Sequence, residues 1–377
     1  MINDNDIHFL SSIGIDVFKK DRKYWFIRTQ SGMYYDDFTK ENFVGIEWDE
    51  ISDLNFIKTA SDDEWRIKIL ENYKDVEKPG SIINQIKKFV NEIKAGDIVL
   101  IPNYKSRWLA IGEIINDDIE IFKEDIDFES ILYSLDDNEI KENKTIIKKR
   151  RKVKWLKEVK RSDWDPYLEP IIHSNSAILD ADKYALYIDR MLSQFYIKGD
   201  EAFLTYKVNK KSNIHYRDML NFLNNNDKLI TLFSSNCPNL DLDINDVILK
   251  INVQSKGPIQ FKGTFKTILI SGIIIGGLFG TNFSFNFLGQ EFNIETEGLP
   301  ALIKAITESV VAIKNSEKNE ELEAIINALN IDKDKLEIDF PQLKSPSDMT
   351  TESETSSDEE VIDNNEVDNS LSQYDGK

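Results

Sequence analysis

Three tryptophans in a polar setting are the side chains of this sequence best suited to hold a flat ligand. Trp48, Trp108 and Trp155 each lie in or beside a segment rich in β-branched and aromatic residues, and Arg28 ends another such segment. An aromatic ring can stack on any nucleic-acid base, which contributes about 1–3 kcal/mol per base. Large aromatic side chains also dominate small cores, so core packing is the alternative for each tryptophan. We expect these four residues to line a pocket for a base or nucleotide.

A cluster of basic residues surrounds the last of these tryptophans. Ten Lys or Arg fall within positions 144–161, where Glu158 is the only acid, although the whole chain has a net charge of −20. Lysine and arginine at phosphates give salt-sensitive binding. A solvated surface that balances the acidic stretch Asp117–Asn143 is the alternative. From this cluster we expect phosphate contacts by Lys149, Arg150, Arg151, Lys152 and Lys154.

A third feature is an uncharged window over residues 267–290, in which Gly272, Gly276 and Gly280 recur every four residues. Small residues at this spacing let helix backbones approach closely. The apolar segment TILISGIIIGGLFG would rise about 21 Å as a helix, short of the roughly 30 Å hydrocarbon core of a membrane. We expect self-association through the three glycines, in or near a bilayer. A buried helix of a water-soluble core is the alternative.

Other common chemistries find little support. His8, His173 and His215 are scattered without metal-ligand spacing, and no phosphate-binding GxxxxGK[ST] motif occurs. The single Cys237 excludes a disulfide framework. The first ten residues carry acids where a signal peptide would carry bases. We therefore expect no cofactor, and a location in the cytoplasm, extending to the inner face of the cell membrane.

The N-terminal part should provide short strands that position the tryptophans. Strand-like segments are YWFIRT from Tyr24, FVGIEW from Phe43, AGDIVLIPNY, RWLAIGEI and RKVKWLKEV, and apolar spacing predicts a helix from Ile82 to Ile93. All six tryptophans lie within the first 164 residues, which indicates a domain boundary downstream. These patterns predict a small mixed β-barrel-like domain with helices.

The C-terminal part has a different pattern. Residues 180–226 have mainly helical spacing, residues 240–265 look extended, and two amphipathic helices follow Pro300. From Ser345 the chain holds ten acids and one base, which predicts disorder. We expect an α+β protein with an extension at 1–21, a binding domain at 22–200, a smaller α/β domain at 201–344 with the glycine-rich segment, and a disordered acidic tail at 345–377.

The ordered succession WFIR, DDF, VGIEWDEISDL, INQIKKFVNEIKAGDIVLIP, WLAIGEI and RKVKWLKEV resembles the N-terminal domain found ahead of some Mrr-type restriction endonucleases. That domain is similar in turn to EVE and PUA-like modules. The resemblance covers roughly residues 22–200 and implies a PUA-like β-barrel whose aromatic pocket accepts a base, often a modified one. The acidic insertion around Asp117–Asn143 departs from the pattern and could alter the rim of the pocket.

The same resemblance raises a catalytic alternative. Mrr-type nucleases carry a D…(E/Q)-x-K core, in which carboxylates bind Mg²⁺ and the lysine stabilises charge at the phosphate. Asp243, Gln254 and Lys256 match this pattern, with Asp241 and Asp246 nearby. The glycine-rich hairpin that usually precedes the metal-binding aspartate is missing. A Mg²⁺-dependent, modification-dependent restriction endonuclease therefore remains the alternative function.

Taken with the resemblance, these residues favour a prokaryotic antiviral-defence protein that binds rather than catalyses. Its N-terminal domain would bind a nucleic-acid base or a nucleotide signal. Its C-terminal domain would act by self-association or at a membrane, and we expect a homo-oligomer. A non-catalytic nucleic-acid-binding adaptor, which needs no membrane, is the third hypothesis.

Overall fold

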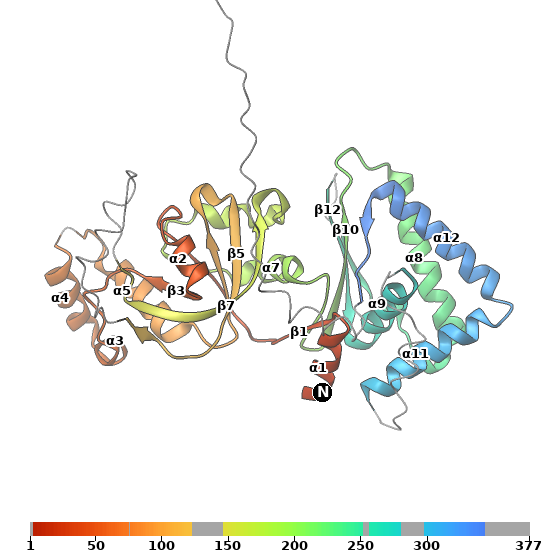
Figure 1. Cartoon of the computed structure of the whole chain (residues 1–377), viewed down its shortest axis with the longest axis horizontal. Helices are drawn as coiled ribbons and strands as arrows, with labels where there is room; N and C mark the ends of the chain where they lie inside the picture. Colours follow the sequence, from red (N-terminus) through yellow and green to blue (C-terminus); the bar gives the residue numbers. More distant parts are fainter. Residues whose placement is uncertain (1–2, 75, 123–145, 252–255, 280–297, 344–377) are drawn as a thin grey trace, which may run out of the picture.

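The computed structural model describes residues 3–74, 76–122, 146–251, 256–279 and 298–343. Within them the chain forms two lobes side by side, each built on one sheet and its helices (Figure 1). The expected α+β character is confirmed, since strands and helices alternate along the whole described chain. Gln254, Gly280, the acidic insertion beyond residue 122 and the acidic tail at 345–377 lie outside the described residues.

The N-terminal lobe is built on a curled, half-barrel sheet. Its strand order is β3 (Phe43–Ile46), β7 (Lys149–Lys160), β5 (Trp108–Ile114), β4 (Ile98–Pro102), β2 (Tyr24–Ile27) and β8 (Ile178–Asp180), with β6 (Glu120–Ile121) paired to β7. Strands β2 and β4 run parallel, and the other neighbours are antiparallel. A register shift between Ile111 and Gly112 interrupts the β5–β7 pairing. Such irregularities increase local twist, which helps the sheet to curl.

Helices cover both faces of this sheet. One face packs against α2 (Tyr35–Lys40), α3 (Leu54–Thr59), α4 (Asp62–Asn72), α5 (Pro79–Lys87) and the π-turn η1 (Lys88–Glu92). The other packs against η4 (Pro166–His173), η5 (Asp182–Tyr184) and α7 (Ala185–Leu192). Strand β2 is buried at all four residues because it is covered on both sides. The strands expected from the sequence are confirmed, and the expected helix over 82–93 is α5 continued by η1.

The C-terminal lobe has its own sheet, in the order β1 (Asp16–Phe18), β9 (Phe195–Lys198), β10 (Glu201–Val208), β12 (Gly257–Thr264) and β11 (Ile248–Ile251). The short strand β13 (Ile338–Asp339) also pairs with β10. Helices α8 (Tyr216–Asn236), α9 (Phe265–Phe279), α11 (Leu299–Lys314) and α12 (Asn319–Leu336) lie on the side of the sheet away from the N-terminal lobe (Figure 1). Two short turns, η6 (Pro238–Leu240) and η7 (Ile244–Asp246), connect α8 to β11.

The N-terminus belongs to this second lobe. Helix α1 (Asp4–Ser12) and the turn that follows it add Leu10, Ile13 and Ile15 to the same core cluster as Phe195, and β1 pairs in parallel with β9. Residues 4–18 and 195–198 therefore pack with the C-terminal sheet, although we drew the sequence boundaries at 21 and 200. The chain crosses between the lobes near residues 19–23 and again near 193.

The expectation that residues 180–226 are mainly helical is correct only in part. Its two helical segments form α7 and the start of α8, but β9 and β10 form a hairpin over 195–208 that turns at Gly199 and Asp200. Helix α7 ends at Leu192, just before the aromatic residues Phe195, Tyr196 and Phe203, which pack in the sheet. Apolar residues at spacings of three and four also satisfy short strands, so the periodicity could not distinguish the two.

Candidate functional site

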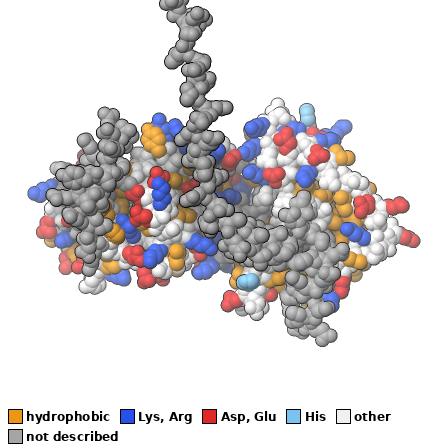
Figure 2. All heavy atoms as spheres, viewed as in Figure 1, with side chains coloured by type: hydrophobic (Ala, Val, Ile, Leu, Met, Phe, Trp, Pro, Cys, Tyr) orange, Lys and Arg blue, Asp and Glu red, His pale blue; other side chains and the backbone are white. Residues whose placement is uncertain are grey.

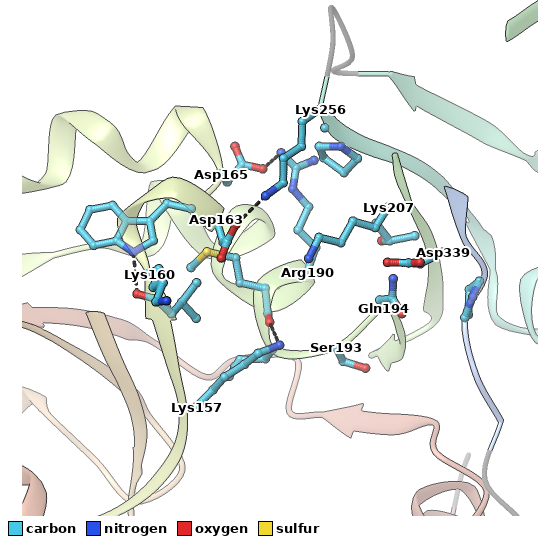
Figure 3. A pocket seen from close by; sticks show the side chains of 18 of the residues that line it. Lys157, Lys160, Asp163, Asp165, Arg190, Ser193, Gln194, Lys207, Lys256 and Asp339 are labelled. Atoms are coloured by element: carbon cyan, nitrogen blue, oxygen red, sulfur yellow. Dashed lines mark hydrogen bonds and ion pairs between the residues drawn. The ribbon is translucent and has the colours of Figure 1, made fainter. Parts of the chain in front are cut away.

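A cavity of about 760 Å³ lies between the two lobes and is lined by residues of both. The N-terminal lobe lines it with Trp108, the end of β7, the turn η3 (Arg161–Asp163) and the end of α7. The C-terminal lobe lines it with residues of β10, the start of β12 and the segment 339–342. We call it the junction cavity; Figure 3 shows side chains from both lobes converging there.

Charged side chains make up much of its wall. Five are basic (Lys157, Lys160, Arg190, Lys207 and Lys256) and four are acidic (Glu158, Asp163, Asp165 and Asp339). The chain as a whole has 47 basic and 67 acidic residues. The junction cavity is thus richer in cations than the rest of the molecule, which favours an anionic ligand.

A buried ion pair fixes one wall. Arg190, near the end of α7, donates to the carboxylate of Asp165, and both side chains are almost completely buried. Asp165 also accepts a hydrogen bond from the backbone N–H of Tyr167 at the start of η4. Breaking such a pair would leave a charge buried without compensation, so the wall is held firmly. The Nε of Arg190 has no hydrogen-bond partner among the described residues.

Three lysines surround Asp163. Lys256 of the C-terminal lobe donates to its carboxylate across the cavity (Figure 3). This hydrogen bond, and then the charges of Lys256, Lys207 and Lys160, hold the pKa of Asp163 below its ordinary value. Among the described residues the side chain of Lys207 makes no hydrogen bond or ion pair, and the ammonium group of Lys160 lies over the ring of Trp108 without a hydrogen bond or ion pair of its own. The carboxylate of Asp163 therefore pairs with Lys256 but leaves the charges of Lys207 and Lys160 without an ion-pair partner of their own.

Lys157 adds a partly buried cation to the same cavity. Its Nζ donates to the carbonyl oxygen of Met191 at 2.6 Å. Burial, and then the nearby charge of Lys207, lower the pKa of Lys157. Two lysines that repel each other would both be stabilised by an anion placed between them.

Trp108 provides the flat surface. It begins β5, pairs directly with Lys160 on β7, and its ring lies 5.1 Å from the Nζ of Lys160. Its backbone N–H donates to the side chain of Asn103, which anchors the start of the strand. The indole is half-buried, so part of the ring is accessible within the cavity wall. A stacking surface and free cations therefore share one cavity.

A second polar network lies where the lobes meet. Arg22 donates to Asp189 at 2.6 Å, and Lys198 of β9 donates to Asp189 at 2.9 Å and to the hydroxyl oxygen of Tyr24 at 2.8 Å. The guanidinium of Arg22 also lies 3.6 Å from the ring centre of Phe18 in β1. Burial, and then the charge of Asp189, raise the pKa of Tyr24 far above its ordinary value. These contacts join the two lobes and so position the walls of the cavity.

Of the four residues expected to share a base pocket, only Trp108 lines the junction cavity. Trp155 packs against the core between the N-terminal sheet and helices α2 to α5. Its ring lies close to Gly112 there, and its Nε1 donates to the carbonyl oxygen of Phe38. Trp48 also packs against this core and adopts a positive φ of 64°. Arg28 lines a separate, smaller cavity. The structure thus does not bring the four together: Trp108 lines the junction cavity, Trp48 and Trp155 pack against a core, and Arg28 lines a different cavity.

The basic cluster is divided by the pleat of β7. Lys149 and Arg151 are fully buried, so the expectation that they contact phosphates was wrong. Lys149 donates to the carbonyl oxygen of Trp48 at 2.7 Å, and Arg151 donates to the carbonyl oxygens of Phe89 and Val90 within η1. Burial lowers the pKa of both groups.

The alternate residues of β7 face outward. Arg150 pairs with Glu41 and Lys152 with Glu120, while Lys154 is exposed. Acidic and basic side chains are also interspersed over the face of both lobes shown in Figure 2. A continuous phosphate-binding stripe along the start of β7 is therefore not formed, whereas Lys157 and Lys160 at its end reach the junction cavity.

The glycine repeat packs inside its own lobe. A Cβ on Gly272 would lie 2.3 Å from the ring of Phe195, and one on Gly276 would lie 2.6 Å from Leu343. Both glycines are buried in α9, so the expected contact between copies of the chain is replaced by a contact within one chain. Gly280 lies outside the described residues. Among the described helices, none combines the length and apolar character needed to cross a membrane.

The candidate nuclease residues are not assembled in the described part of the chain. Asp243 caps the turn η7 by accepting from the backbone N–H of Asn245, and Lys256 pairs with Asp163 of the other lobe. Gln254 lies outside the described residues. Within those residues, no group of three or more His, Cys, Asp or Glu side chains could hold a metal ion.

Several cavity residues have no pattern that marks them in the sequence. Arg190, Lys207 and Asp339 are single charges within a helix or a strand. Lys157 and Lys160 could have been found, because they occupy the C-terminal half of the basic cluster. The sequence pattern assigns Lys256 to a candidate nuclease site and not to ligand binding.

Comparison with known proteins adds one match. A family model described as a domain of unknown function (DUF8426) matches residues 23–173. No curated protein and no solved structure matches the chain. The matched stretch runs from β2 to η4 and includes Trp108, Lys160 and Asp163, whereas Lys207 and Lys256 lie beyond it.

Proposed function

We propose that this chain is a sensor and effector of prokaryotic antiviral defence that binds a nucleic-acid base or nucleotide in the junction cavity. The observation that carries the ligand class is the combination of Trp108 with Lys160, Lys207 and Lys256 around one cavity of about 760 Å³. Pockets of roughly 300–1,000 Å³ are typical of small-molecule sites. The base would stack on Trp108, and phosphates would take the place beside the lysines that Asp163 now partly fills.

Such a ligand would couple the two lobes. A phosphate near Asp163 would compete for Lys256, whose ion pair with Asp163 links the C-terminal lobe to the N-terminal lobe. A ligand shifts the equilibrium between two arrangements of the lobes only if it binds one arrangement more tightly than the other. Contacts with both lobes would provide that difference in affinity. The N-terminal lobe would thus sense the ligand and the C-terminal lobe would respond.

The finer fold and the setting rest on the resemblance of residues 22–200. A curled sheet with helices is compatible with a PUA- or EVE-like module, and the likeness to domains ahead of Mrr-type restriction endonucleases favours antiviral defence. Because one fold hosts many functions, the ligand is argued from the cavity and not from the fold.

Self-association remains part of the proposal, but at another surface. Among the described residues, strand β11 is the last strand of the C-terminal sheet, and all four of its residues are exposed, including Ile248, Leu249 and Ile251. An exposed apolar edge strand is a template for pairing with another strand. A second copy of the chain, paired antiparallel through β11, would provide hydrogen-bond partners for the backbone groups at the edge of both sheets and would join the two sheets into one.

To test ligand binding, the full chain is titrated with nucleoside monophosphates of all common bases. Binding is measured by tryptophan fluorescence and by calorimetry. Trp108→Ala should weaken binding about 5-fold to 150-fold, the range expected for one stacking contact. Lys207→Gln should weaken binding and flatten its salt dependence, whereas Lys228→Gln, a matched change of an exposed lysine on α8, should do neither. Unchanged affinity in both cavity variants, with unchanged circular dichroism, would exclude the junction cavity as the site.

A further inference from the structure

A second, smaller cavity of about 240 Å³ lies between the loop after β2 and the loop between β4 and β5. Among the described residues, its charged lining consists of Arg28 and Lys105, with no acidic residue, and the hydroxyl-bearing residues Thr29, Ser31 and Ser106 complete much of the wall. In a chain with twenty more acids than bases, an all-cationic cavity is unusual. Its volume admits a phosphate group, and its two cationic side chains would attract one.

The guanidinium of Arg28 is fixed there without a carboxylate. It donates to the carbonyl oxygens of Ile172 and Ser174, and its Nε is buried with no hydrogen-bond partner among the described residues. Carbonyl oxygens hold the group in position but leave its positive charge uncompensated. A fixed, unneutralised arginine is the feature that phosphate sites commonly use.

The two loops are held in an unusual shape. Gln30, Ser31, Lys105 and Ser106 all have positive φ angles between 48° and 56°. Gly32 has a φ of +96°, and a Cβ there would lie 2.3 Å from the backbone nitrogen of Tyr104, so only glycine allows the loops to meet. Such backbone conformations cost energy and tend to gather at binding sites.

The small cavity and the junction cavity adjoin along the chain. Tyr104, Lys105 and Ser106 line the small cavity, and Trp108, two residues later, lines the junction cavity. Tyr104 is 57% exposed with the Nζ of Lys105 5.1 Å from its ring, which repeats the pairing of Trp108 with Lys160. From Tyr104 to Trp108 the chain can span at most about 14 Å. A short polynucleotide could therefore contact both aromatic rings.

We propose that the small cavity is a phosphate subsite for a single-stranded nucleic acid whose neighbouring base stacks on Trp108 in the junction cavity. The ligand is then an oligonucleotide and not a free mononucleotide. Alternating aromatic and cationic side chains suit single strands, where stacking and phosphate contacts act together. This inference rests on the proposed function, because the Trp108 end of the strand occupies the site described above.

The experiment compares how tightly the full chain binds uridine or thymidine monophosphate and the corresponding tetranucleotides. Affinities are measured by fluorescence anisotropy with unlabelled competitors. We expect each tetranucleotide to bind at least tenfold more tightly than its monophosphate. Lys105→Gln should reduce the slope of log affinity against log salt for the tetranucleotide by about 0.7, the value for one phosphate contact on a single strand. The uridine and thymidine series distinguish RNA from DNA.

Tyr104→Ala should weaken tetranucleotide binding about 5-fold to 150-fold. It should leave monophosphate binding unchanged, and Tyr216→Ala, which removes a tyrosine that is 79% exposed on the other lobe, should alter neither. Equal affinity for monophosphate and tetranucleotide, or equal loss of both in the Tyr104 and Lys105 variants, would overturn the subsite while leaving the proposed function intact. Failure of every nucleotide to bind would instead overturn both.

Discussion

The contact between α9 and β9 gives a prediction in which two known effects oppose each other. In a helix interior, Gly→Ala gains about 1 kcal/mol where nothing packs against the new methyl group. At Gly272 that methyl carbon would lie 2.3 Å from Cζ and 2.5 Å from Cε1 of Phe195. Carbon atoms prefer about 3.5–4.0 Å, so the ring would have to move by more than about 1 Å.

Phe195 is 2% exposed in the core of the C-terminal lobe, so the ring has little space to move into. Overpacking of a tight core costs about 1–3 kcal/mol, and the size of this overlap favours the upper part of that range. Subtracting the gain in helix propensity, we expect Gly272→Ala to lower the free energy of unfolding by about 1–2 kcal/mol. For a lobe of this size, that corresponds to a fall in Tm of about 2–8 °C.

The assay is denaturant unfolding of the full chain, followed by far-ultraviolet circular dichroism. Gly80→Ala is the matched control, because Gly80 lies in the first turn of α5 with nothing within 4 Å of a new Cβ. It should be neutral or stabilising by up to about 1 kcal/mol. Phe195→Leu should recover part of the loss when combined with Gly272→Ala, which a double-mutant cycle would detect. If Gly272→Ala is as stable as the natural chain, α9 does not pack on Phe195 as described.

Three further predictions follow from burial and exposure. Arg151→Met should destabilise the N-terminal lobe by at least about 2 kcal/mol in thermal unfolding, because the carbonyl oxygens of Phe89 and Val90 within η1 lose their donor; an unchanged Tm would contradict this. Burial lowers the pKa of Lys149, so the folded state binds this proton less readily than the unfolded state does. The contribution of Lys149 to the free energy of unfolding is therefore complete above the ordinary lysine pKa and is lost as pH falls through the lowered pKa. Relative to the natural chain, Lys149→Met should therefore become less stable as pH rises from 7 toward 10.5 in denaturant titrations, and a difference independent of pH would refute the burial argument. Ile248→Lys on β11 should shift sedimentation velocity toward monomer, whereas Ile331→Lys, which changes an equally exposed isoleucine on α12, should not; identical sedimentation of both variants would remove β11 as the contact.

Local patterns in the sequence determined most of the elements. Segments such as IVLIP and WLAIGEI formed β4 and β5, and the helix expected over 82–93 formed as α5 and η1, because β-branched content and helical spacing act within a few residues. The hairpin of β9 and β10 was missed because its apolar residues fit helical spacing as well as a strand. There the pairing of β9 with β1, far away in the sequence, supports the strand.

Tertiary structure alone decided which of the chemical side chains share a site. Lys149 and Lys160 belong to one basic cluster, yet the pleat and length of β7 bury the first and bring the second beside Trp108. Lys256 and Asp163 are 93 positions apart in the chain and meet only because the two lobes lie side by side. The sequence determined the kinds of groups available, aromatic rings and cations. Burial and the approach of the two lobes, which depend on contacts distant in sequence, determined which of them remain free to bind.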